Sequence, residues 1–190
     1  MTRAIERSRY IALLALLVIT SCSTFTAKNT NINESYWTAE GKLAFKHEGK
    51  SQKANIRWQQ QGGDYDILLF GPLGKGKIAI TKHDKTITLN DGNQLHHSAN
   101  AEELLYRVSG LELPISYAQH WITGAPSPNT THTMLAEPSA DFEQAGWKVS
   151  YLRFTNDEAH RLPTKIIISN DAQRLTIIIK RWSYANKEPQ

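Results

Sequence analysis

The sequence predicts a mainly β protein, in which a strongly bent antiparallel sheet is covered by about three helices. Apolar and polar residues alternate over several short segments, which is typical of strands with one buried face. Short turns separate these segments, and short connections favour antiparallel pairing. In the middle of the chain the apolar spacing becomes helical. Because a sheet with one apolar face must be covered, we expect these helices to pack on it.

The chain begins with the pattern of a bacterial lipoprotein signal. Three arginines precede an apolar run over residues 11–19, and small residues then lead to Cys22. This run is about half of the ~20 residues that span a bilayer. We therefore expect a signal peptide over residues 1–21, with lipid attached to Cys22. In the lipoprotein pattern that this segment resembles, Asp after the cysteine keeps a protein at the inner membrane. Ser23 stands there instead, which indicates the periplasmic leaflet of the outer membrane. The alternative is an ordinary secreted protein with a chance cysteine.

Composition limits the class of protein. Cys22 is the only cysteine, which excludes disulfides, thiol nucleophiles and cysteine metal sites from the rest of the chain. Residues 22–190 hold 19 basic and 17 acidic residues, a balance that does not suit a nucleic-acid-binding protein. We expect a flexible tether over residues 22–35, a single domain over residues 36–185 and a tail over residues 186–190.

The first half of the domain has the pattern of an antiparallel meander. In residues 36–46 the odd positions are apolar or glycine and the even positions are mostly polar, which predicts a strand with one buried face. Gly, Asp and Asn mark the turns between the strands. Further strands are expected at residues 53–59, 65–70, 77–82, 86–90 and 94–97.

Helices are expected in the middle of the chain, before the pattern returns to strands. Asn100 and Glu103 form a candidate capping box for a helix that Gly110 ends. A second helix is expected over residues 114–124, where proline opens and glycine closes the segment, and a short third helix over residues 138–143. Strands are expected again at residues 147–154, 164–169 and 174–182. An Asn-Asp turn joins the last two.

The sequence contains no recognisable catalytic or phosphate-binding motif, so we expect a protein that is not an enzyme and needs no cofactor. The seven histidines are scattered. His96 and His97 are adjacent in a predicted strand, so their side chains point to opposite faces and cannot hold one metal ion together. Glu102 and Glu103 fit the first turn of a helix better than a catalytic acid–base pair. No metal site is therefore expected.

Five tryptophans lie inside predicted strands and helices. One interpretation is that each is an ordinary core residue. The other is that their large rigid rings line a roomy apolar cavity between the sheet and the helices, as in lipid-binding barrels. The pattern is compatible with both interpretations.

The segment over residues 71–76 is a glycine-rich turn in which Leu73 is the only large apolar residue. Leu73 either packs against the edge of the sheet or projects into solvent, where it can contact a membrane. Inserting one Leu side chain into hydrocarbon gains roughly 1.5–3 kcal/mol, which suits transient contact. Lys75 and Lys77 would then help by meeting anionic head groups.

Nine short segments, none of them specific alone, together cover essentially the whole of residues 22–190. They are Cys22 in its lipobox, GKLA at 41–44, WQQ at 58–60, GPLG at 71–74, LELP at 111–114, WITGAP at 121–126, QAGWKVSY at 144–151, LP at 162–163 and Trp182. In this order they resemble the LolB family, the outer-membrane lipoprotein receptors of Gram-negative bacteria.

This resemblance implies an antiparallel half-barrel, capped by helices, that encloses an apolar cavity. It also implies a receptor that takes acylated lipoproteins from the periplasmic carrier LolA and inserts them into outer-membrane phospholipid, as a monomer, without covalent chemistry or ATP. Pro72, Leu73 and Gly74 match the family's membrane-insertion loop. The alternatives are a carrier of another apolar ligand, a scaffold lipoprotein that binds envelope proteins, and an uncharted hydrolase. The expected cavity residues are Trp37, Leu43, Trp58, Leu69, Trp121, Trp147 and Trp182.

Overall fold

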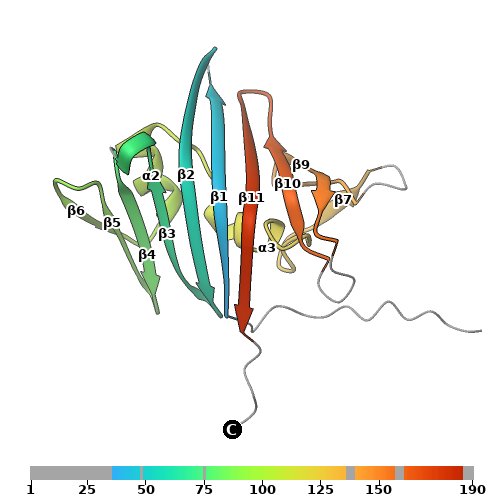
Figure 1. Cartoon of the computed structure of the whole chain (residues 1–190), viewed down its shortest axis with the longest axis horizontal. Coiled ribbons are helices and arrows are strands. Elements are labelled where there is room, and N and C mark those ends of the chain that lie inside the picture. Colours follow the sequence, from blue (N-terminus) through green and yellow to red (C-terminus); the bar gives the residue numbers. More distant parts are fainter. Residues whose placement is uncertain (1–35, 48, 75, 136–139, 157–160, 186–190) are drawn as a thin grey trace, which may run out of the picture. The chain divides into compact units, whose positions relative to one another are not determined.

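One open antiparallel sheet of eleven strands forms the framework of the domain (Figure 1). The computed structural model describes residues 36–47, 49–74, 76–135, 140–156 and 161–185. The strand order is β6-β5-β4-β3-β2-β1-β11-β10-β9-β8-β7, with antiparallel pairing throughout. The predicted mainly β class is confirmed. The expected signal peptide, Cys22, the tether and the tail lie outside the described residues.

All strands predicted from the sequence are present, and two further strands, β7 and β8, lie between α3 and β9. The strands before the helices are β1 (Tyr36–His47), β2 (Lys50–Gln61), β3 (Asp64–Phe70), β4 (Ile78–His83), β5 (Thr86–Asn90) and β6 (Leu95–Ser98). Those after the helices are β7 (His132–Met134), β8 (Phe142–Gln144), β9 (Trp147–Phe154), β10 (Pro163–Ser169) and β11 (Gln173–Ala185). The described helices are α2 (Ala101–Ser109), α3 (Ile115–Trp121) and the short 3-10 helix η2 (Pro72–Gly74).

The first and the last described strand meet in the middle of the sheet. β1 pairs with β2 on one side and with β11 on the other, and Leu43 lies opposite Ile177. The β1–β11 pairing contains a β-bulge between Glu40 and Gly41. A Cβ atom added to Gly41 would lie 2.0 Å from the carbonyl oxygen of Ile178. The close approach of β11 therefore requires glycine at this position.

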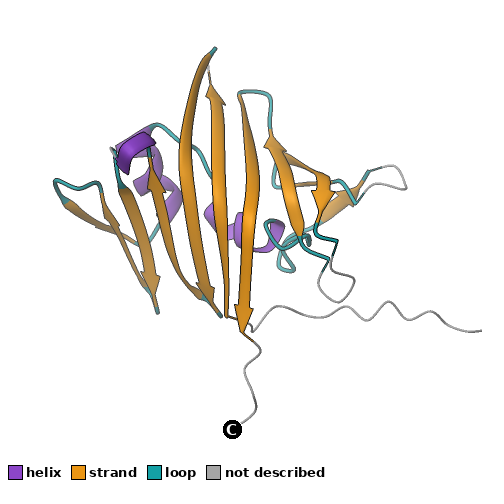
Figure 2. Ribbon diagram, viewed as in Figure 1, coloured by secondary structure: helices purple, strands orange, loops and turns teal. Residues whose placement is uncertain are grey.

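One face of the sheet is apolar and buried, and the other is polar. Alternate residues of β3 and β11, such as Ile67, Leu69, Ile177 and Ile179, are buried. The helices α2 and α3 lie behind the strands in the view of Figure 2, and their buried residues join the same apolar cluster as those of the sheet. The core therefore lies between the sheet and the helices, as the alternation predicted.

The helix α2 begins and ends where the sequence predicts. The side chain of Asn100 accepts a hydrogen bond of 3.0 Å from the backbone N–H of Glu103, as an N-cap does. Gly110 has a φ of 70° and donates its N–H to the carbonyl oxygen of Tyr106. This left-handed conformation favours glycine. The helix α3 follows directly after Pro114, as predicted. None of the described helices has the length and apolar character needed to cross a bilayer.

The third helix predicted over residues 138–143 is wrong in the part that the structure describes. That part ends in β8, in which Phe142 and Gln144 are buried and the residue between them is exposed. A tight turn at Ala145 and Gly146, both with positive φ, leads back into β9. The alternation of period two and the pairing with β9 thus decide the structure here. The strand β7 gave no such signal, because all three of its residues are exposed.

Candidate functional site

The seven residues predicted to line a cavity lie together in the interior of the domain. Trp37, Leu43, Trp58, Leu69 and Trp121 are buried in one apolar cluster, which also contains side chains from both helices. Trp147 and Trp182 are partly buried and pack against the same cluster. Alternation along the strands therefore identified the correct face of the sheet. It did not indicate whether these side chains leave space between them.

Three of the tryptophans pack against one another across β2, β1 and β11. The ring centroids of Trp37 and Trp58 are 6.0 Å apart, and those of Trp37 and Trp182 are 5.4 Å apart. The indole N–H of Trp58 donates to Oε1 of Gln60 at 2.9 Å. That of Trp182 donates to the carbonyl oxygen of Pro163 at 2.9 Å. The three indoles thus pack in this part of the interior, and the N–H groups of Trp58 and Trp182 are paired.

Two pockets open beside this tryptophan cluster, at the end of the sheet where β1 begins. One has a volume of about 430 Å³ and is lined by Trp37 together with polar residues such as Asp64 and Gln61. The other has a volume of about 310 Å³ and lies beside Trp182, between the ends of β10 and β11. Neither is lined by Leu43, and both have polar linings in part. The enclosed apolar cavity therefore stays a prediction.

We use the name helical cover for α2, α3 and the segment over residues 110–114 that joins them. The α3 side of this cover is fixed to the sheet by hydrogen bonds that converge on Gln144 of β8, which is 2% exposed. Its Oε1 accepts from the indole N–H of Trp121 and from the backbone N–H of Ser127, both at 2.8 Å. Its Nε2 donates to the carbonyl oxygens of Ser127 and Thr130.

Two further hydrogen bonds hold α3 in place. The hydroxyl of Tyr151 in β9 donates to the carbonyl oxygen of Trp121 at 2.8 Å. Burial, and then the nearby carboxylate of Asp141, raise the pKa of Tyr151 far above its ordinary value, so the hydroxyl keeps its proton as a donor. Gln60 of β2 donates from Nε2 to Oε1 of Gln119 at 3.3 Å. α3 is therefore bonded to three strands.

The α2 side of the cover is held differently. Its buried residues Ala101, Leu104 and Leu105 contact the core, and the helix lies next to β5, β6 and α3. The one hydrogen bond from the described residues of α2 to another element joins Oε1 of Glu102 to the backbone N–H of Ser116 in α3, at 2.8 Å. Apolar contact is therefore the main attachment of α2 to the sheet.

Among the described residues, the segment between the helices makes one side-chain hydrogen bond with the sheet. Gln173, at the start of β11, donates from Nε2 to Oε2 of Glu112. On either side of Glu112, Leu111 and Leu113 are buried in the core. The segment is therefore fixed beside β11 by both polar and apolar contacts.

The comparisons with known proteins identify the family. The sequence model described as "Outer membrane lipoprotein LolB" matches residues 35–182. The chain belongs to the LolB family. The outer-membrane lipoprotein LolB of Cellvibrio japonicus is 33% identical over 156 residues, which cover 77% of this chain and 76% of that protein. LolB of Halorhodospira halophila is 28% identical over 189 residues, which cover 90% and 92% of the two chains.

Membership of the LolB family makes the protein an outer-membrane lipoprotein that acts in lipoprotein localisation. Its fold is similar to that of a LolA superfamily protein from Nitrosomonas europaea, with a TM-score of 0.51 and 8% identity. That likeness covers 82% of this chain and 88% of the other. At such low identity it supports the fold and nothing further.

The loop that resembles the LolB insertion loop follows directly after β3. Pro72, Leu73 and Gly74 form the single 3-10 turn η2. The backbone N–H of Gly74 donates to the carbonyl oxygen of Gly71 at 3.2 Å, and Gly74 has a φ of 76°. Pro72 and Gly74 are exposed. The tight turn predicted from the glycines is confirmed, whereas its role at a membrane stays a prediction.

The sequence interpretation missed Gln144 as the residue that fixes the cover, although the QAGWKVSY segment was noted. A signal was present, because Gln144 occupies an inward position two residues after Phe142. A polar side chain at such a position needs buried partners. Within the described residues, no group of three or more His, Asp or Glu side chains is arranged to hold a metal ion.

Proposed function

We propose that this protein is the receptor that accepts acylated lipoproteins from the periplasmic carrier LolA and releases them into the outer membrane, without covalent chemistry or ATP. Membership of the LolB family supports this function. The structural observation that carries it is an apolar sheet face covered by two short helices, one of which is attached mainly by apolar contacts.

The physical need for such a receptor follows from the acyl chains. Each buried methylene is worth about 0.8 kcal/mol, so a multiply acylated protein cannot cross water unshielded. Transfer without ATP requires that each acceptor along the route hold the chains better than the previous one. An apolar interior that opens for the chains meets the first requirement, and the proposal assigns this protein a higher affinity for them than the carrier has.

The way in which α2 is attached supports opening on that side of the cover. Contacts of Leu104 and Leu105 with the core are apolar and non-directional, so an acyl chain can replace them without leaving polar atoms unpaired. Displacement of α3 would instead break the hydrogen bonds of Gln144 and Tyr151. In this proposal α2 moves, α3 stays, and acyl chains enter between α2 and the sheet.

The proposed lining consists of the inward residues of the strands and α3. Among them, Leu43 and Leu69 offer apolar surface in the middle of β1 and near the end of β3. The tryptophans offer large rigid surfaces that need little reordering. The proposed acyl-chain residues are Trp37, Leu43, Trp58, Leu69, Trp121, Trp147 and Trp182.

Release is assigned to the loop over residues 71–76 and attachment to Cys22. A single Leu73 side chain that enters hydrocarbon contributes roughly 1.5–3 kcal/mol. This is enough for repeated contact with the bilayer and too little for a permanent anchor. Lipid on Cys22 would keep the domain at the membrane throughout.

The deciding experiment measures acceptance and release separately. The lipidated protein is reconstituted in vesicles, and acylated cargo is supplied on the carrier LolA. We expect Leu73→Glu to accept cargo but to fail in release, because a carboxylate opposes entry into hydrocarbon. Leu95→Glu is the matched control, because Leu95 is 58% exposed on β6. Normal release by Leu73→Glu would contradict the role of the loop.

A photo-crosslinker tests the lining directly. Placed at Leu43 or Leu69, it should react with the acyl chains of bound cargo, whereas at Leu95, which is exposed on β6, it should not. Crosslinks to a different apolar molecule, identified by mass spectrometry, would instead favour a carrier of another ligand. Equal reaction at all three positions would contradict an interior site.

A further inference from the structure

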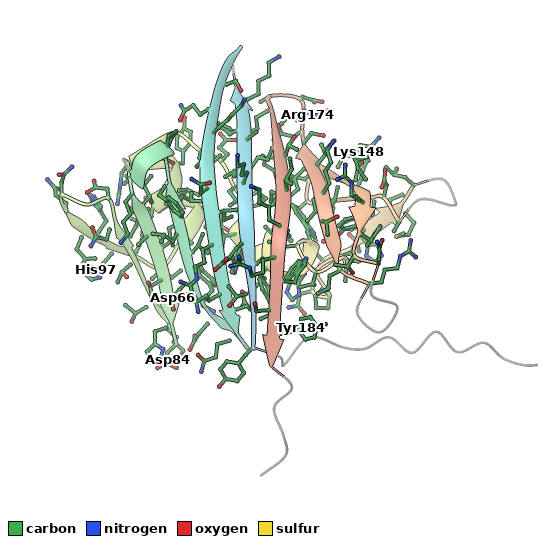
Figure 3. All side chains as sticks on the ribbon, viewed as in Figure 1. Asp66, Asp84, His97, Lys148, Arg174 and Tyr184 are labelled. Atoms are coloured by element: carbon green, nitrogen blue, oxygen red, sulfur yellow. The ribbon has the colours of Figure 1, made fainter. Side chains whose placement is uncertain are left out.

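The outer face of the sheet, opposite to the helical cover, carries a group of cations that extends from the end where β11 begins to the middle of β1. Outward positions of β1 and β2 contribute Lys42, Lys46 and Lys53, and β9, β10 and β11 contribute the rest. Figure 3 labels two of them, Lys148 and Arg174, at the end of the sheet away from Asp66 and Asp84. We use the name basic face for Lys42, Lys46, Lys53, Lys148, Arg153, Lys165 and Arg174.

Within the described part of the chain, these cations lack the carboxylate partners that Arg57 and Arg181 of the same sheet have. Arg57 and Arg181 share Glu40, at 3.5 and 2.7 Å. Among the described residues, no ion pair involves a residue of the basic face. In the strand register, the one carboxylate opposite a cation of this face is Glu143, across from Lys148.

Like charges even lie opposite each other on neighbouring strands. Lys46 is the register partner of Arg174, and Arg153 is the register partner of Lys165. Such pairs are destabilising. The seven cations of this face carry a formal charge of +7, whereas the chain as a whole has +4, so the remaining residues sum to −3 and positive charge is concentrated on this face. An anionic partner that covers the face would relieve this repulsion.

Apolar groups lie between the cations. Ile178 is 40% exposed and sits between Lys42 of β1 and Lys165 of β10 in the register. Ile167, at the next outward position of β10, is partly exposed. A surface that mixes lysines with a few exposed aliphatic side chains suits the boundary between head groups and acyl chains.

We propose that the basic face docks the domain onto the anionic lipid surface of the membrane that holds this lipoprotein. Five of the seven cations are lysines, which are depleted in protein–protein interfaces, so a lipid surface fits better than an acidic protein. Each basic residue close to an anionic leaflet adds to its attraction.

The length of chain before β1 permits this orientation. With the proposed anchor at Cys22, thirteen residues lie between the anchor and Tyr36, and this stretch spans at most about 50 Å when extended. Docking by the basic face would direct α2 and α3 toward the aqueous side, because they lie on the opposite face of the sheet. This inference depends on membership of the LolB family and not on the proposed cargo transfer. The docking proposal can therefore fail while the transfer proposal is correct, and the transfer proposal can fail while the docking proposal is correct.

The experiment uses the lipidated protein, reconstituted without cargo or carrier, and follows acylation of its lysines by mass spectrometry. Vesicles of phosphatidylcholine are compared with vesicles that also contain about 30 mol % phosphatidylglycerol. We expect anionic vesicles to slow modification of Lys42, Lys46, Lys53 and Lys165 about fivefold or more relative to Lys85, in the β4–β5 turn. About 0.5 M NaCl should abolish this protection.

Matched charge reversals complete the test. Lys42→Glu and Lys165→Glu should each remove most of the protection from the remaining lysines of the basic face. Lys85→Glu changes the net charge equally but should leave the protection intact, which is judged in this variant from the ratio of modification rates in the two kinds of vesicle, because the reference lysine is absent. Equal modification rates in both kinds of vesicle would overturn the proposal. Protection that appears only when LolA is added would also overturn it and would identify the face as a protein-docking surface.

Discussion

The two helices that cover the sheet differ in how they are attached. α3 is held by hydrogen bonds that need particular partners, with Gln144 bonded to Trp121, Ser127 and Thr130 and with Tyr151 bonded to the end of the helix. α2 contacts the core through apolar side chains, and the one hydrogen bond that joins it to another helix or strand among the described residues goes to α3.

This difference separates the part of the cover that is fixed from the part that can be replaced. A buried hydrogen bond that is broken leaves a donor and an acceptor without partners, at a cost of about 1–3 kcal/mol for each group. An apolar contact that is broken costs nothing further once another apolar group takes its place. An acyl chain is such a group. The polar side of the cover thus fixes its position, and the apolar side can exchange helix for ligand.

The largest expected effect is that of removing the polar centre under α3. Gln144→Leu leaves the indole N–H of Trp121, both backbone groups of Ser127 and the carbonyl oxygen of Thr130 without their partner. We expect the free energy of unfolding, measured in urea, to fall by about 3–5 kcal/mol. An acylated ligand should not restore it, because an acyl chain offers no hydrogen bonds. Gln59→Leu, at an exposed position of β2, is the control and should change stability little.

Shortening one buried side chain of α2 should lower the free energy of unfolding somewhat less than Gln144→Leu does. Part of this loss should be restored by an acylated ligand. Leu105 is fully buried, so Leu105→Ala should lower the free energy of unfolding by about 2–4 kcal/mol. If acyl chains occupy the space between α2 and the sheet, an acylated peptide should recover part of this loss. The same peptide should do much less for Gln144→Leu. Equal recovery in both variants would contradict the proposed difference between the two helices.

The same contrast explains which parts of the fold were predictable from the sequence. α2 was predictable at both ends, because Asn100 and Gly110 act on backbone groups within one turn. β8 was not, because its pairing with β9 is made by residues across a turn, and a short segment that contains Phe142 is compatible with helix or strand. Local signals determine caps and turns, whereas pairing between strands decides ambiguous segments.

For the candidate site, the sequence predicted which side chains face the interior but not how the helices are attached over them. Alternation placed Leu43, Trp58 and Leu69 on one face, and the structure confirms that they share a core. Whether that core opens depends on how α2 packs, which no local pattern encodes. The hydrogen bonds of Gln144 join residues up to 23 positions apart, so its role depends on the complete fold.

A smaller effect is expected at the start of α2. Asn100→Ala removes the acceptor for the backbone N–H of Glu103, which costs about 1 kcal/mol of helix stability. If α2 must leave the sheet for a ligand to enter, this loss favours the open form, and the affinity for an apolar fluorescent dye should rise about fivefold. Asn93→Ala, in an exposed turn, is the control. An unchanged or weaker affinity in Asn100→Ala would contradict the movement of α2.

The smallest expected effect is a dependence of stability on pH that comes from α3. Burial lowers the pKa of the half-buried His120 below its ordinary value, which is about 6.5 and also applies to the unfolded chain. As the pH falls below about 6.5, the unfolded state therefore binds a proton first, and the free energy of unfolding decreases until the folded state is protonated as well. We expect wild type to lose more stability than His120→Gln between pH 7.5 and pH 5.5 in urea unfolding. Ser116→Ala, at an exposed position of α3, adds no titratable group and should show the same pH dependence as wild type. If His120→Gln and wild type show the same pH dependence, His120 is as well solvated in the folded protein as in the unfolded chain. α3 would then be packed less tightly on the sheet than its hydrogen bonds indicate.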